Sequence, residues 1–205
     1  MGASCGHDSN FDGASQQYRR ALWAVIIINV SMFVVEMVGG AMSRSMALRA
    51  DALDFLGDSL TYSISLAAIG MSLRVRASVA LVKGISLALM GLGVFGFSVW
   101  HFFMTTIPDA TTMGGIGFLA LVANVASVLI LLKFRDGDAN VRSVWLCSRN
   151  DAIGNVAVII AAGTVAITHS PYPDLIVALM MSGLFLSSAW QILRQASGEW
   201  RQTKP

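Results

Sequence analysis

Six long apolar runs are the feature that most constrains how this chain can fold. A helix needs about 20 apolar residues to cross the hydrocarbon core of a bilayer. Runs of that length stand at residues 20–42, 46–73, 79–104, 113–133, 143–168 and 173–193. Charged residues make up only 13% of the 205-residue chain, against roughly 25% in soluble domains. We therefore predict an all-α protein, a six-helix transmembrane bundle that forms a single membrane domain.

The segments outside these runs are short and polar. Residues 1–19 do not have the pattern of a signal peptide, because the first apolar run has the length of a full span. We predict a disordered N-terminal tail at 1–19, a transmembrane domain at 20–193 and a short tail at 194–205. The last segment leaves no room for a soluble domain.

The two cysteines, Cys5 and Cys147, are too few to predict a disulfide framework. Cys5 lies close to His7 and Asp8 in the N-terminal tail. These three residues could capture a metal ion at the mouth of a pathway, as the alternative to a disordered tail. Their spacing is not diagnostic of a metal site.

Basic residues are distributed unevenly among the loops. With six spans and both ends on one side, eleven Lys and Arg residues fall on that side and two on the other, while Arg149 lies within a span. The eleven are Arg19, Arg20, Arg74, Arg76, Lys83, Lys133, Arg135, Arg142, Arg194, Arg201 and Lys204, and the two are Arg44 and Arg49. Because basic loops stay in the cytoplasm, we predict that both termini are cytoplasmic.

Five acidic residues lie within the predicted spans: Glu36, Asp51, Asp54, Asp58 and Asp151. A charged side chain at the centre of a bilayer costs about 2.5–3.5 kcal/mol on insertion scales, so several of them cost on the order of 10 kcal/mol. One arginine within the spans cannot neutralise them. The cost must be offset by bound protons, hydrogen bonds or a cation.

Asp51, Asp54 and Asp58 are separated by three and four residues, which places them on one face of a helix. Neighbouring like charges disfavour joint ionisation, so these groups retain protons unless a cation is present. Because metal ligands must be deprotonated, a divalent ion that binds here releases protons. Asp51 is nearest the outer end, where it is either the mouth of the pathway or an acid that starts the helix.

The fifth span places Cys147, Asp151 and Asn155 four residues apart on one face. At 1.5 Å per residue, Asp58 and Asp151 each lie on the order of 12–18 Å inside the membrane. Two antiparallel helices thus bring their acidic residues to a similar depth.

These two helices together predict a metal site. Two carboxylates from one helix, with a carboxylate and a thiolate from the other, suit a tetrahedral zinc-like ion. The predicted ligands are Asp54, Asp58, Cys147 and Asp151, with Asp51, Asn150 and Asn155 as possible additional ligands. The alternative is that the acidic residues are protonated or hydrogen-bonded packing elements. For Glu36 we favour a hydrogen-bonded helix contact over an ion relay.

The chain resembles the cation diffusion facilitator family of divalent metal transporters. The family's first two helices are similar to the stretch NVSMFVVEMVGGAMSRSMALRADALDFLGDS. The second of these helices carries His or Asp, then three residues, then Asp in the family, and the matching residues here are Asp54 and Asp58. NVRSVWLCSRNDAIGNVAVIIAA resembles its fifth helix, in which Asp151 matches the family's Asp. YPDLIVALMMSGLFLSSAWQIL looks like its sixth. The resemblance covers nearly all of residues 20–195.

Two features depart from the family pattern. Cys147 stands where the family usually has His, and thiolates select softer ions, so zinc and cadmium should gain over manganese or iron(II). The cytoplasmic domain that follows the last helix in typical members has no counterpart in 194–205. The resemblance therefore implies a short form that forms homodimers through its transmembrane helices.

The residues and the resemblance together predict a transporter, not an enzyme. The resemblance implies efflux of Zn²⁺ or Cd²⁺, exchanged for protons by alternating access, in the cytoplasmic (inner) membrane of a bacterium. Metal ions and protons would be its substrates and the lipid bilayer its environment, without a resident cofactor or a nucleic-acid partner. The alternatives are an intramembrane aspartyl protease built on Asp58 and Asp151, a cation channel, or a membrane scaffold.

Overall fold

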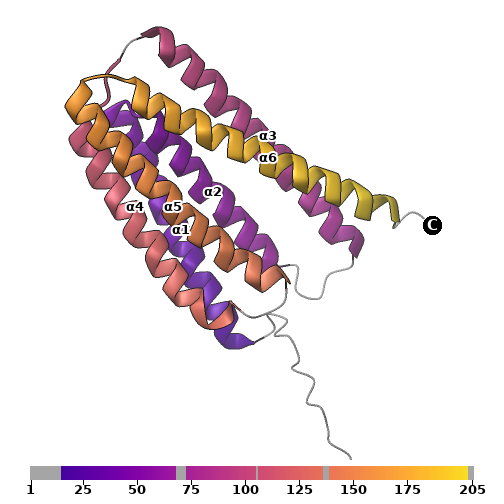
Figure 1. Cartoon of the computed structure of the whole chain (residues 1–205). Coiled ribbons are helices and arrows are strands. Elements are labelled where there is room, and N and C mark those ends of the chain that lie inside the picture. The colour runs from indigo at the N-terminus through magenta and orange to yellow at the C-terminus, as the bar shows by residue number, and fades with distance from the viewer. Residues whose placement is uncertain (1–14, 68–72, 105, 136–138, 203–205) are drawn as a thin grey trace, which may run out of the picture.

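The fold is all-α, as predicted (Figure 1). The computed structural model describes residues 15–67, 73–104, 106–135 and 139–202, and this part of the chain contains no β-strand. The helices are α1 (Gln16–Ser43), α2 (Met46–Ala67), α3 (Leu73–Met104), α4 (Ala110–Leu131), α5 (Ala139–Thr168) and α6 (Tyr172–Gln202), with a 3₁₀ turn η1 (Leu132–Phe134) after α4. Residues 1–14, with Cys5, His7 and Asp8, lie outside the described residues.

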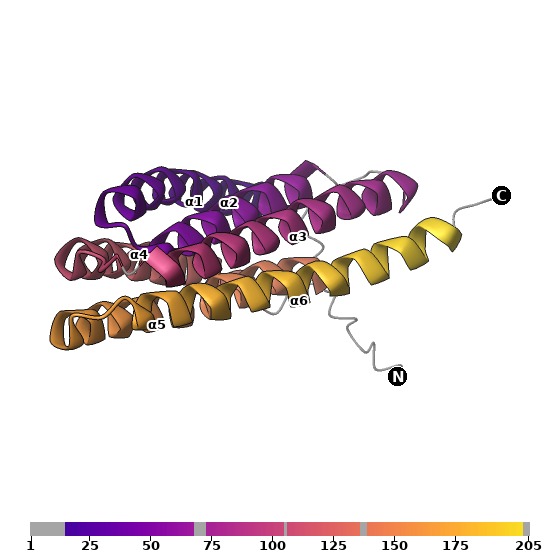
Figure 2. The ribbon, with the colours of Figure 1, turned by 90° about the horizontal axis from the view of Figure 1, so that it is seen from above.

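Five of the six helices are long and apolar enough to cross a membrane by length and composition. They are Gln16–Ser43, Ala80–Met104, Ala110–Phe134, Ser148–Thr168 and Tyr172–Gly198. Helix α2 is the exception, because its 22 residues include Arg49, Asp51, Asp54 and Asp58. It nevertheless lies within the bundle beside α1 (Figure 2). The six-helix membrane bundle is therefore confirmed, while the cytoplasmic position of the termini stays a prediction.

Local sequence signals determine where α1 begins and ends. The side chain of Ser15 accepts a hydrogen bond from the Tyr18 N–H at 3.1 Å, so α1 starts before residue 20. At its other end Arg44 adopts a left-handed conformation, with φ at 58°, and the Ser45 N–H donates to the Gly40 carbonyl. The chain thus reverses into α2 within two residues. We call the end of the bundle that holds this turn and the starts of α4 and α6 the outer end.

The helices form two groups. Helices α1, α2, α4 and α5 pack into a bundle, and α3 pairs with α6 alongside it (Figures 1 and 2). The Ser182 hydroxyl donates to the Gly91 carbonyl at 2.9 Å, which joins α6 to α3. Figure 1 shows this pair close to the bundle at the outer end and spread away from α1 and α4 at the opposite end.

Asp174 joins the two groups at the outer end. It lies in the first turn of α6, yet it accepts hydrogen bonds from the Ser45 hydroxyl and from the N–H groups of Met46 and Ala47, the latter two at 2.7 and 3.1 Å. The first N–H groups of a helix have no partners within that helix, so Asp174 caps α2 from a neighbouring helix. The Asp174 side chain is 1% exposed, which makes this contact a buried clamp.

Close packing holds at some glycines and not at others. A Cβ atom placed at Gly39 on α1 would lie 2.0 Å from Ile116 Cδ1 on α4, so the two helices need a glycine there to approach. Gly93 and Gly96 on α3 have no such neighbour within 4 Å.

Candidate metal site

The structure brings together three carboxyl groups of the predicted site. Asp54 and Asp58 on α2 each lie within hydrogen-bonding reach of Asp151 on α5. All three side chains are half-buried. Two carboxyl groups can share a hydrogen bond only if one holds a proton, so this arrangement requires protons or a cation between them. The predicted match in depth between Asp58 and Asp151 is thereby confirmed.

These carboxyl groups are neighbours, but they do not form a closed coordination shell. Among the residues that the structure describes, no three His, Cys, Asp or Glu side chains are arranged to hold a metal ion. Cys147 belongs to α5, but its side chain lies outside the described residues. A bound metal would need the carboxyl groups to close around it and at least one further ligand. The four-ligand set therefore stays a prediction.

The two asparagines proposed as additional ligands differ in their surroundings. Asn150 is exposed, and its Oδ1 accepts a hydrogen bond from Arg149 Nη2 at 3.3 Å. Asn155 lies one helical turn beyond Asp151, is 0% exposed, and neither atom of its amide has a hydrogen-bond partner among the described residues. A buried amide without partners is costly. Asn155 is therefore the better placed of the two to complete the site.

Tyr62 is a residue that the sequence analysis missed. Its hydroxyl donates a hydrogen bond to Asp58 Oδ2 and lies 3.3 Å from Ser148 Oγ, and the side chain is 0% exposed. It therefore orients a predicted ligand and links α2 to α5 beside the site. The available signal was its position four residues after Asp58, which puts both on one helix face.

Lys83 is a basic side chain whose charge acts on Asp58. It is half-buried on α3 and brings a positive charge towards the carboxyl groups of the candidate site. Packing of Leu87, one turn further along α3, against Gly57 places this part of α3 beside α2.

The hydrogen-bonded helix contact that we favoured for Glu36 is made with another acid. Its carboxyl group lies within hydrogen-bonding reach of that of Asp51 on α2, and such a bond needs a proton on one of the two groups. Glu36 is 0% exposed and Asp51 1% exposed, and no other N–H or O–H group among the described residues donates to the Glu36 oxygens. Asp51 therefore lies inside the bundle, not at an open mouth.

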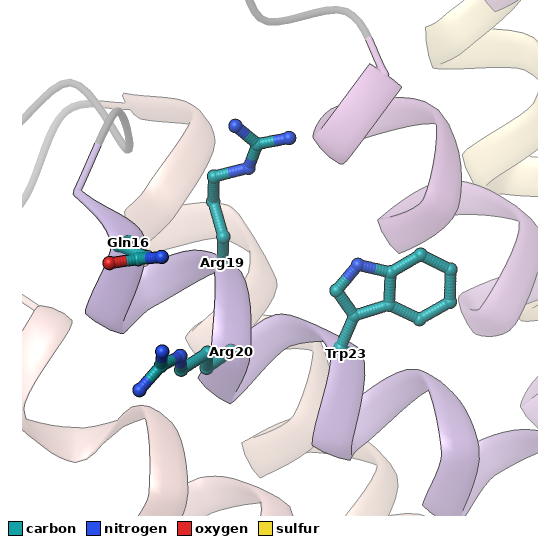
Figure 3. Close-up of a pocket in the computed structure, with 4 residues that line it drawn as sticks. All are labelled: Gln16, Arg19, Arg20 and Trp23. Atoms are coloured by element: carbon teal, nitrogen blue, oxygen red, sulfur yellow. The ribbon is translucent and has the colours of Figure 1, made fainter.

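A pocket of about 410 Å³ lies away from these acidic residues, at the start of α1 (Figure 3). It is lined by Gln16, Arg19, Arg20 and Trp23, and the two guanidinium groups point in different directions. Positive charge repels a metal cation, so this pocket is not a cation site.

The sequence matches the family of the cation efflux transmembrane domain over residues 22–199. The chain belongs to this family. The resemblance to cation diffusion facilitators is thereby confirmed, and the family match together with the five apolar helices makes the chain a multi-pass integral membrane protein.

Several named bacterial proteins are similar to the chain. It is 32% identical to the zinc transporter ZitB of Yersinia pestis, over 91% of this chain and 64% of that protein. It is 26% identical to the metal cation efflux system protein CzcD of Cupriavidus metallidurans, over 96% and 64%. It is 23% identical to the cadmium, cobalt and zinc/H⁺-K⁺ antiporter of Bacillus velezensis, over 93% and 65%. The chain thus spans just under two thirds of the length of each.

Proposed function

We propose that this chain carries divalent metal cations across a membrane, out of the cytoplasm, in exchange for protons. The observation that carries the proposal is the meeting of Asp54 and Asp58 with Asp151 between two helices of a membrane bundle. Half-buried carboxyl groups at this depth suit an ion that arrives and leaves, because they are neither sealed in the core nor open to bulk water.

The exchange follows from the electrostatics of the three carboxyl groups. Without a metal, repulsion among them favours bound protons, while a divalent ion favours the deprotonated forms. Metal and protons therefore occupy the site alternately.

The proposed substrates are Zn²⁺ and Cd²⁺. The relatives named above are described as transporters of zinc, or of cadmium, cobalt and zinc with protons. A thiolate from Cys147 would favour such ions over manganese or iron(II). By analogy with the bacterial relatives we propose the inner membrane as the location, and the homodimer stays a prediction.

Metal flux into proteoliposomes across a proton gradient tests this function. Asp58→Asn removes a predicted ligand charge while keeping the shape of the side chain. We expect this variant to lose both zinc flux and the proton movement that zinc drives. Unchanged zinc flux in Asp58→Asn would refute the proposed site.

Asp109→Asn is the matched control. Asp109 is exposed at the outer end and caps α4 by accepting a hydrogen bond from the Thr112 N–H at 2.8 Å, a contact that lowers the pKa of its carboxyl group. Because Asn caps helices as well as Asp does, this variant loses a carboxylate without losing the cap. We expect it to transport zinc like the wild type.

The competing functions predict other results in the same preparation. An intramembrane protease would cleave peptides without metal and would need both Asp58 and Asp151. A channel would pass metal current without proton counterflow. The family match supports transport and gives no support to proteolysis.

A further inference from the structure

Glu36 and Asp51 form a second pair of carboxyl groups, nearer the outer end than Asp58 and Asp151. Glu36 lies eight residues before Arg44 and Asp51 seven after it, so each is about 10–12 Å from the α1–α2 turn. The hairpin therefore brings the two side chains, which come from different helices, to the same depth. Asp54 lies about 15 Å from the turn, between this pair and Asp58.

Apart from each other, these two carboxyl groups have few partners. Both side chains are at most 1% exposed, and no N–H or hydroxyl group among the described residues donates to either oxygen of Glu36 or to Asp51 Oδ2. The two carboxyl groups lie within hydrogen-bonding reach of each other, and both interact with the charge of Asp54. Two ionised carboxylates buried inside the bundle would be costly even before their mutual repulsion is added. A positively charged ligand would offset that cost.

We propose that Glu36 and Asp51 form an outer cation station, at which a divalent metal ion stops between the central carboxyl groups and the outer face. This inference rests on the proposed transport function and adds a step to it. The station consists of two carboxylates, and the ion would retain waters for its other ligands.

A station of this kind suits transfer better than storage. Two carboxylates hold a divalent ion less tightly than the four predicted ligands of the central site, and conduction requires binding that is weak enough to release the ion. Asp54 interacts with Asp51 on one side and with Asp58 and Asp151 on the other, so it connects the two sites. The acidic residues on this face of α2 then provide successive binding positions for the ion, from the centre of the bundle towards the outer end.

Two contacts hold the helices together between the station and the outer end. Asp174 clamps the start of α2 to α6, and Arg49 donates its Nε–H to the Gly40 carbonyl at 3.2 Å, which fastens α2 to α1. An ion bound at Glu36 and Asp51 would therefore leave towards the outer face only after these contacts break.

Cadmium binding to the full chain in lipid nanodiscs tests the station directly. Asp58→Asn disables the central site, and we expect it to retain a weaker Cd²⁺ binding event. Adding either Glu36→Gln or Asp51→Asn should abolish this residual Cd²⁺ binding. Two separate substitutions are used so that misfolding of one variant does not decide the result. The absence of residual binding in Asp58→Asn overturns the station, because the pair would then hold only protons. Residual binding that survives both additions overturns it as well.

Zinc transport kinetics provide a second test. Glu36→Gln alone should lower the maximal rate about tenfold, because a slower release step of about 1.4 kcal/mol corresponds to that factor. The KM on the cytoplasmic side should stay within about twofold, since the central site still loads. If Glu36 only packed against its neighbours, Glu36→Gln would not lower the maximal rate while leaving the KM unchanged.

The outcomes separate the two proposals. Wild-type transport together with an unchanged maximal rate in Glu36→Gln overturns the station and leaves the transport function intact. A wild-type chain that moves no zinc or cadmium refutes the transport function itself. Asp109→Asn serves again as the control and should match the wild type. It removes a carboxylate from the same end of the bundle, but not from the acidic face of α2.

Discussion

The clamp formed by Asp174 should be the most costly single contact to remove at the outer end. Asp174→Ala leaves three buried donors without an acceptor: the Ser45 hydroxyl and the N–H groups of Met46 and Ala47. A buried donor that loses its partner costs about 1–3 kcal/mol, and the loss of a helix cap about 0.5–2 kcal/mol. These contributions overlap, because two of the donors are the capped N–H groups. We expect a loss of about 3–4 kcal/mol in the free energy of unfolding.

Thermal or denaturant unfolding in a fixed detergent measures this loss. Asp174→Asn retains one acceptor oxygen and should lose roughly half as much stability. Asp109→Ala is the comparison, because it removes a helix cap that is exposed to solvent and should cost clearly less. If Asp174→Ala is no more destabilising than Asp109→Ala, the buried hydrogen bonds of Asp174 contribute little to the free energy of unfolding.

Three further predictions concern the site and the packing around it. Tyr62→Phe should weaken zinc binding about tenfold, since losing a group that orients a metal ligand typically costs 10–100-fold in affinity. Equilibrium titration with zinc measures this loss, and Ser148→Ala should have a smaller effect. Gly39→Val should lower the free energy of unfolding by about 1–3 kcal/mol through overpacking against α4, whereas Gly93→Val, with open space around it, should not. Cys147→Ser should reduce transport of Cd²⁺ relative to Zn²⁺, and an unchanged ratio would remove the thiol from the site.

The periodic features of the chain were predictable from sequence. The apolar runs gave the number of helices, and the spacing of Asp54 and Asp58 put them on one face because a helix repeats every 3.6 residues. Their meeting with Asp151 followed from the similar depth that we predicted for Asp58 and Asp151 in two antiparallel helices. Each of these inferences needs only distances along one helix or a match in depth between two.

Contacts that depend on how the helices rotate about their axes were not predictable. Asp174 is an ordinary acid in the first turn of α6 by sequence, and only the packing of α6 on α2 turns it into the cap of another helix. Gly91 and Gly93 lie two residues apart, yet only Gly91 faces a neighbour, with Leu186 Cγ at 3.0 Å from its would-be Cβ. Hydropathy does not distinguish them, because lipid and the protein interior are both apolar.

Helix α2 shows how a weak membrane span can be the functional one. Taken alone, it carries too many charges to count as a span, yet α1 and α5 surround its acidic face, so its charges are placed inside the protein and not in lipid. The same enclosure makes the carboxyl groups depend on protons or cations for neutralisation. Lys83 on α3 supplies positive charge near Asp58, so we expect it to compete with an incoming metal ion. We therefore expect Lys83→Gln to bind zinc more tightly than the wild type, and Lys83→Arg, which keeps the charge, to bind it equally well. Weaker binding in Lys83→Gln would show that the lysine holds the site in shape and does not act as a competing cation.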